Sequence, residues 1–219
     1  IGVTDYLLKP ISSAKLLEAV KKVGDMIEKE QDNVRLMERY EKEMEENILQ
    51  EKHKLWGALA SNRLSTIELL EKGQRLGMDF TASAYMVFLF KLMQEGDATG
   101  CSDELNRASE KVNSLSGSWK KVLSFDRSPE GWAFLIKGES EAEVLENFAE
   151  TKKELLNLVA VYPKVEYFGG LGSIVQRIGD IQNSYKEAAR AFSSRFFLDA
   201  NQIADSAEMI SLYNEEDGK

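Results

Sequence analysis

The chain has 219 residues, of which 43% are hydrophobic, so it can bury a sizeable core as one domain with accessory pieces or as two small domains. Its 28 basic and 37 acidic residues give a net charge of −9 at pH 7, which repels a phosphate backbone and argues against direct DNA binding by this part of the protein. One cysteine, Cys101, excludes an internal disulfide, and no apolar run reaches the ~18 residues of a membrane helix, so we expect a cytoplasmic protein without membrane contact.

The first ten residues predict a strand that ends at a proline. Tyr6 and Leu8 would point to one face of this strand and Leu7 and Lys9 to the other, and Pro10 precedes a Ser-Ser helix start. A strand that simply ends at a helix-starting proline would have the same pattern. The segment Asp-Tyr-Leu-Leu-Lys-Pro also resembles the end of the receiver domain of two-component response regulators.

The resemblance to a receiver domain implies roles for three of these residues. In that family the lysine contacts a phosphoryl group on an aspartate, an aromatic residue three positions earlier is the switch side chain, and the Lys-Pro peptide turns into the last helix. These roles would fall on Lys9, Tyr6 and Pro10. The resemblance further implies that residues 1–27 are the C-terminal end of a receiver domain whose phosphorylated aspartate lies upstream.

Residues 12–61 contain no proline and only two glycines, which predicts one long helix or two helices end to end. Apolar residues recur every seven positions along it. Nine of the twelve seam positions are apolar, and the exceptions are Glu30, Glu41 and Glu51. This heptad pattern is typical of a coiled coil.

The many charged residues on this helix leave a narrow apolar stripe, which fits a seam between two helices better than packing on a globular domain. Residues 28–54 carry fifteen charges in twenty-seven positions, so the apolar stripe is narrow. An amphipathic helix on a globular domain is the alternative. We predict a coiled-coil linker at 28–61 and a parallel homodimer through helices 12–56. The predicted seam consists of Val20, Val23, Ile27, Val34, Met37, Met44, Ile48 and Leu55.

Residues 62–205 are predicted to form a compact α+β domain. A capping box, Ser65-x-x-Glu68, begins a short helix, and Gly77 ends it. Strand, helix, strand, strand, helix, strand and helix are then predicted at residues 84–92, 103–116, 119–125, 131–137, 140–161, 164–172 and 178–197. This βαββαβα order is that of a ferredoxin-like sheet with helices packed on one face. The almost continuously apolar first strand should be central and covered on both faces.

The end of this domain carries more specific signals than the order of its elements. They are Val165-Glu-Tyr-Phe-Gly-Gly-Leu-Gly-Ser173, Asp180-Ile-Gln-Asn-Ser-Tyr-Lys-Glu-Ala-Ala-Arg-Ala-Phe192 and Arg195-Phe-Phe. These runs resemble the GGDEF-like sensor modules found between receiver and AraC-type DNA-binding domains. The resemblance implies an AraC-type response regulator, in which a sensor histidine kinase phosphorylates the receiver. Residues 206–219 would then be a tail leading to paired helix-turn-helix motifs outside this chain.

The turn between the two middle strands decides whether cyclase chemistry is expected. In active diguanylate cyclases this turn holds GTP and metal through a Gly-Gly-Asp-Glu-Phe signature. The equivalent turn, Asp126 to Gly131, has one glycine and a proline, which favours a polar hairpin turn. Asp126 and Glu130 could in principle bind a hard cation instead, since Mg²⁺ prefers carboxylate oxygens.

Other candidate residues also favour packing over chemistry. The run Gly169-Gly-Leu-Gly172 could expose backbone N–H groups to an anion, but it lacks the spacing of a phosphate loop, so we interpret its glycines as close packing. Tyr185 lies at core spacing on its helix, and Trp56 is interpreted as a core or interface anchor. We therefore expect no catalytic residues, no metal site, no cofactor and no enzymatic activity.

The sequence thus predicts the regulatory middle region of a response regulator that controls transcription. Receiver phosphorylation would be relayed through dimerisation and the linker helices to an AraC-type output domain, which alone would bind DNA. Two alternatives remain open. One is a nucleotide-binding or diguanylate-cyclase-like enzyme domain, and the other is a coiled-coil adaptor protein.

Overall fold

A computed structural model describes residues 13–94 and 103–205 of the chain. The predicted receiver residues Tyr6, Lys9 and Pro10 and the 206–219 tail lie outside the described residues, as does Cys101. The described residues fall into two compact units that divide after Gln50, and each is considered by itself.

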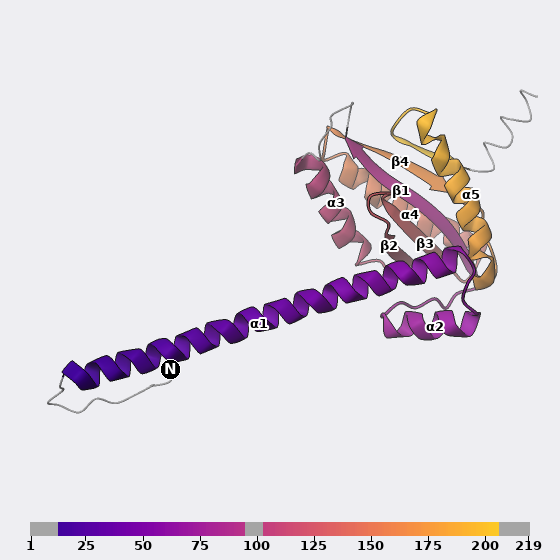
Figure 1. The fold of residues 1–219 in the computed structure, drawn as a ribbon. Helices are drawn as coiled ribbons and strands as arrows, with labels where there is room; N and C mark the ends of the chain where they lie inside the picture. The colour runs from indigo at the N-terminus through magenta and orange to yellow at the C-terminus, as the bar shows by residue number, and fades with distance from the viewer. Residues whose placement is uncertain (1–12, 95–102, 206–219) are drawn as a thin grey trace, which may run out of the picture. The chain divides into compact units, whose positions relative to one another are not determined.

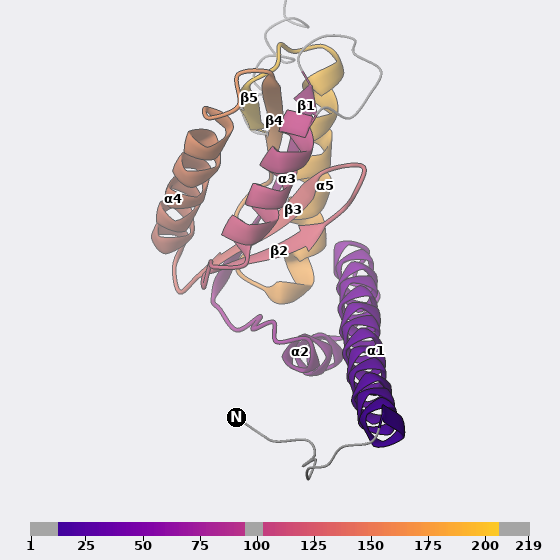
Figure 2. The same ribbon diagram turned by 90° about the vertical axis from the view of Figure 1, so that its left-hand side faces the viewer.

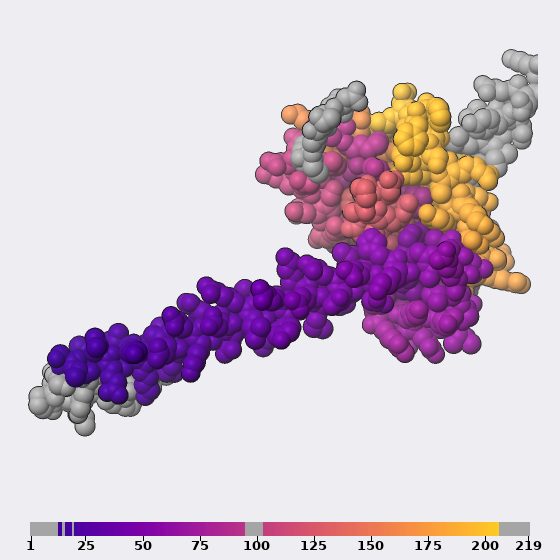
Figure 3. All heavy atoms as spheres, viewed as in Figure 1, coloured from indigo at the N-terminus to yellow at the C-terminus, as the bar shows by residue number. Residues whose placement is uncertain are grey.

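The first unit is the N-terminal part of helix α1, which spans Ser13–Ala60 without a break (Figure 1). Seven of the predicted seam residues lie in this unit, and all are exposed, from 36% for Val23 to 67% for Met37. Figure 3 shows the side chains along this part of α1 at the surface. The single long helix is confirmed, and the predicted pairing of two such helices stays a prediction.

Leu55 corrects one end of the predicted seam. It is 3% exposed and belongs to the core of the second unit, together with Trp56 and Leu59. The heptad spacing continues to Leu55, but here the apolar stripe packs on the sheet domain of its own chain. Leu55 is therefore unavailable to a second helix, and a seam can include only the residues up to Ile48.

The second unit contains a five-stranded sheet with the order β2-β3-β1-β4-β5 (Figure 1). The first four strands pair antiparallel, and β5 pairs parallel to β4. The strands are β1 Ala84–Gln94, β2 Val122–Asp126, β3 Trp132–Gly138, β4 Val165–Leu171 and β5 Gln202–Asp205. The predicted α+β fold is confirmed, and β5 is an additional edge strand.

Four helices accompany the strands in this unit beside the end of α1. They are α2 Thr66–Arg75, α3 Asp103–Ser116, α4 Glu141–Val159 and α5 Ile181–Ser193. Short 3₁₀ turns, η1 Ile178–Asp180 and η2 Ser194–Phe196, flank α5. The predicted capping box begins α2: the Ser65 hydroxyl accepts from the Glu68 N–H, and the Glu68 carboxylate accepts from the Ser65 N–H. Gly77, with φ of +68°, follows the helix as predicted.

The helices cover both faces of the sheet, so the prediction of helices on one face was wrong. Tyr85, Val87 and Leu89 of β1 join a core beneath α5, α2 and the end of α1. The alternating residues Met86 and Phe88 join a second core beneath α3 and α4. Figure 2 shows α4 and α5 on opposite sides of β4. The apolar side chains on both faces of β1 require this double cover, as its continuous apolar sequence predicted.

Candidate functional site

An aromatic cluster joins the end of α1 to the hairpin and to α5. The Trp56 ring lies 4.8 Å from the Phe125 ring of β2, between centroids, and 5.5 Å from the Tyr185 ring of α5 in an edge-to-face arrangement. Trp56 is 5% exposed and Phe125 is 1% exposed. We call Trp56, Phe125 and Tyr185 the aromatic junction. The end of α1 is therefore packed against both β2 and α5 through one tryptophan ring.

The hairpin turn between β2 and β3 follows directly after this junction. Arg127 places its guanidinium carbon 5.9 Å from the Tyr185 ring centroid. The Asp126 carboxylate accepts hydrogen bonds from the Ser128 N–H at 2.8 Å and from the Ser128 hydroxyl at 2.7 Å. The Glu130 carboxylate lies 3.4 Å from the Arg195 guanidinium. Both acids of the turn thus have partners within the domain.

The backbone conformation at Gly131 explains why this turn contains a glycine. Its φ of +90° is strained for other residues, and a Cβ atom there would collide with the Phe90 carbonyl oxygen. The turn therefore needs its glycine for close approach to β1. Within the described residues, no group of three or more His, Cys, Asp or Glu side chains could hold a metal ion.

The glycines of Gly169-Gly-Leu-Gly172 serve close packing of β4. A Cβ atom on Gly169 would lie 2.7 Å from the Phe88 ring, and one on Gly170 would lie 2.5 Å from the Ala188 carbonyl oxygen of α5. A Cβ on Gly172 would collide with the Ser184 backbone. The backbone of β4 is therefore filled on both faces by side chains and by α5, as predicted from the sequence.

Comparison with known protein families assigns this unit. Residues 61–193, more than half of the chain, match the GGDEF-like domain family. The chain belongs to this family. No curated protein matches the chain significantly. Among the described residues, the structure contains no helix with the length and apolar character needed to cross a membrane.

The Ser-Tyr-x-Glu-Ala run of this GGDEF-like domain attaches α5 to the sheet. The Ser184 hydroxyl, fully buried, accepts from the Val87 N–H of β1 at 2.9 Å. The Glu187 carboxylate accepts from the Ser173 N–H just after β4 at 2.9 Å. Between them, Tyr185 packs in the aromatic junction. The run is thus an attachment motif, and the sequence alone indicated only the packing role of Tyr185.

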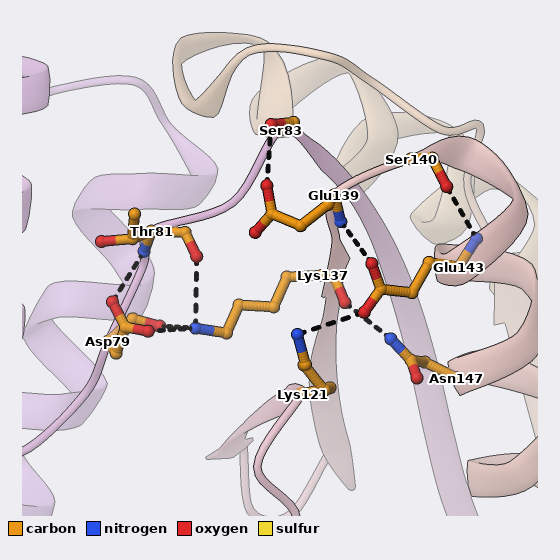
Figure 4. Close-up of polar contacts among 9 residues, drawn as sticks. All are labelled: Asp79, Thr81, Ser83, Lys121, Lys137, Glu139, Ser140, Glu143 and Asn147. Atoms are coloured by element: carbon orange, nitrogen blue, oxygen red, sulfur yellow. Dashed lines mark hydrogen bonds and ion pairs between the residues drawn. The ribbon is translucent and has the colours of Figure 1, made fainter.

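A polar network at the end of β3 was missed by the sequence analysis (Figure 4). The Lys137 side chain is 4% exposed, and its ammonium donates to the Asp79 carboxylate at 2.7 Å and to the Asp79 and Thr81 carbonyl oxygens. The hydrogen bond from Lys137, followed by one from the Thr81 N–H, lowers the pKa of Asp79 to about 2. In the sequence, this network could have been inferred from Lys137, a lysine at the end of an apolar strand.

The same network continues to the start of α4 (Figure 4). The Glu143 carboxylate accepts from the Glu139 N–H and pairs with Lys121 at 3.1 Å, and these two contacts lower the pKa of Glu143. Asn147 donates its amide to the Lys137 carbonyl oxygen. These groups satisfy one another around the end of β3. Their arrangement joins the end of β3 to residues 79–81 and to the start of α4.

Proposed function

We propose that the chain is the regulatory middle region of a two-component response regulator that controls transcription. In this proposal a sensor histidine kinase phosphorylates a receiver domain, and the signal passes along α1 into the GGDEF-like domain. An AraC-type helix-turn-helix domain would bind DNA. The protein would be a cytoplasmic homodimer, and the GGDEF-like domain would transmit a signal without catalysing a reaction.

One observation carries the proposal: α1 bears the predicted seam and also supplies Trp56 to the aromatic junction. The helix is continuous from Ser13 to Ala60. A change in how the seam pairs would therefore act on the end of α1, and the rings of Phe125 and Tyr185 lie against that end. From there it would reach the hairpin and α5, which precedes β5 and the C-terminal residues.

The absence of catalysis is supported by the hairpin turn. A cyclase needs carboxylates that are free to hold a metal ion, whereas Asp126 is engaged by Ser128 and Glu130 by Arg195. Incubation of the full chain with GTP and Mg²⁺ is expected to leave the nucleotide unchanged over hours. Formation of a cyclic dinucleotide or of pyrophosphate would instead support the enzyme alternative.

Dimerisation through the seam is tested by paired substitutions. Val34→Asp with Ile48→Asp should give a sedimentation mass of one chain, 24.7 kDa, where the unaltered protein gives twice that mass, because two carboxylates would be buried without partners. The matched control is Leu36→Asp with Leu49→Asp. These residues are also exposed, at 49% and 46%, but lie off the seam. The control should remain a dimer.

The relay itself is tested by hydrogen exchange on the same two double variants. If the seam acts through the aromatic junction, Val34→Asp with Ile48→Asp should change amide protection in α5 and in β2, while α3 and α4 on the other face stay unchanged. The off-seam control should match the unaltered protein. Identical protection in a monomeric seam variant would disprove the relay and leave α1 as a dimerisation element only.

A further inference from the structure

A groove beside α2 has features of a ligand site. It has a volume of about 480 Å³, within the range of roughly 300–1,000 Å³ that is typical of small-molecule sites. Leu70 of α2 and Phe80 line one wall, and Arg177 to Asp180, around η1, line the other. We call it the α2 groove. It lies outside the hairpin turn and the aromatic junction, so the relay does not use it.

One wall of the α2 groove is held in place by two buried side chains. Residues 78–82 are neither helix nor strand, yet the buried Tyr85 hydroxyl lies 2.7 Å from the Phe80 carbonyl oxygen and 2.8 Å from that of Ala82. Lys137 binds the Asp79 and Thr81 carbonyl oxygens. Four consecutive carbonyl groups are thus fixed by two buried side chains. The wall is formed before any ligand arrives, which lowers the entropic cost of binding.

The opposite wall offers two opposite charges. Arg177 is exposed and Asp180 is half-buried, and both line the groove. Within the described part of the chain, neither side chain makes a hydrogen bond or an ion pair. Asp180 is the N-cap residue of α5 but does not cap it. The two charges are therefore available to a ligand that meets an apolar surface formed by Leu70 and Ile178.

We propose that the α2 groove binds a small zwitterion with an apolar side chain, of the chemical class of a free amino acid. The ligand carboxylate pairs with the planar Arg177 guanidinium, which suits a carboxylate geometrically. The ligand ammonium pairs with Asp180, and the ligand side chain packs on Leu70 and Ile178. A ligand with a single charge would leave one of the two protein charges unpaired. The site uses residues of the GGDEF-like domain alone and is independent of the proposed dimer.

Calorimetric titration of the full chain with L-leucine and with L-phenylalanine tests the site. Saturable binding is expected for at least one of them. L-leucinamide lacks the carboxylate and N-acetyl-L-leucine lacks the ammonium, and each is expected to bind about 10-fold or more weakly than leucine because a charge-assisted hydrogen bond is lost. Equal binding of all three leucine compounds, or no saturable binding of either amino acid, would overturn the proposal.

Two matched variants locate the binding. Arg177→Gln should weaken the bound amino acid about 10-fold or more, whereas Arg190→Gln, an exposed arginine on α5 outside the groove, should leave its affinity unchanged. Both replacements are at the surface, so equal melting temperatures check that both variants fold. Amide chemical shifts on titration should move around residues 66–82 and 177–180. Equal weakening by the two variants, or shifts confined to other parts of the domain, would exclude this groove.

Discussion

The two parts of helix α1 have the same sequence character and different surroundings. Before Gln50 its seam residues are exposed, with Val20 at 62% and Met37 at 67%, whereas Leu55 and Trp56 are 3% and 5% exposed in the domain core. The heptad pattern runs through both parts. A repeat of apolar residues therefore predicts that a helix will be covered, but it does not determine whether a second chain or the same chain covers it.

Among the substitutions that compare the two parts of α1, replacement of an aromatic residue should give the largest difference in the free energy of unfolding. Trp56→Ala removes a buried ring that contacts Phe125 and Tyr185, and it should lower the free energy of unfolding by about 3–5 kcal/mol. Tyr40→Ala, on the same helix but 57% exposed and off the seam, should change it by less than about 0.5 kcal/mol. Urea denaturation followed by circular dichroism measures both.

Equal effects of these two substitutions would show that the comparison between the parts of α1 is wrong. A small effect of Trp56→Ala would mean that the end of the helix detaches readily from the sheet. The aromatic junction could not then transmit movement from α1. A large effect of Tyr40→Ala would mean that residues before Gln50 are buried by a partner over more than the predicted seam.

Glycines in the two units should respond to alanine with opposite signs. Gly172→Ala places a methyl group against the Ser184 backbone and should destabilise the domain by about 1–3 kcal/mol. Gly24→Ala meets nothing within 4 Å and should stabilise α1 by about 0.5–1 kcal/mol, because alanine favours a helix. Thermal denaturation of both variants gives the two signs. Destabilisation by Gly24→Ala would reveal a close partner at that position.

Much of the sheet domain could be predicted from local patterns. The helix expected at residues 103–116 is α3, and the expected strand at 131–137 differs from β3 by one residue at each end. The capping box at Ser65 was recognisable because it depends on residues only three positions apart. Strand β5 was missed because its four residues contain only two apolar side chains, Ile203 and Ala204.

The contacts of the aromatic junction and of the polar network around Lys137 were harder to predict because they join distant segments. Trp56 was predicted as an anchor, but nothing local connects it with Phe125 or Tyr185. The hydrogen bond between Lys137 and Asp79 spans 58 residues, and a lysine at a strand end is usually at the surface. Burial of β1 on both faces was predicted, but the distribution of the helices between the two faces was not, because it depends on contacts between distant segments. Long-range packing decided each of these cases.

The substitution Asp79→Asn tests the stability of the groove wall that Lys137 holds. Asp79→Asn removes the carboxylate beside the buried ammonium and should cost about 1 kcal/mol at pH 7, a small value because the Asp79 side chain is 70% exposed. The pKa of Asp79 is about 2 in the folded protein, below its ordinary value of 3.8. Its stabilising contribution is therefore present above pH 4 and is lost as the pH falls toward 2.

The pH dependence distinguishes this ion pair from general acid unfolding. The difference in unfolding free energy between the unaltered protein and Asp79→Asn should shrink as the pH falls from 4 to 2, and urea titrations at several pH values measure it. Glu68→Gln is a suitable comparison, since Glu68 also has a lowered pKa but lies in the capping box of α2. A difference that is constant with pH would mean that the Asp79 carboxylate does not interact with Lys137.

The smallest effects are expected from two exposed ion pairs, both of which lie in the second unit. Glu51→Gln removes a pair with Lys54 at 2.7 Å on α1, and Glu130→Gln removes the 3.4 Å pair with Arg195 at the hairpin. Glu130→Gln should change the free energy of unfolding by less than about 0.5 kcal/mol, and less at high salt, and Glu51→Gln should leave the urea midpoint unchanged. Arg195 keeps its contacts with the Phe192 and Phe196 rings after Glu130→Gln. A cost well above 1 kcal/mol for Glu130→Gln alone would show that the turn is held by charge, and that packing at the aromatic junction does not by itself fix the hairpin.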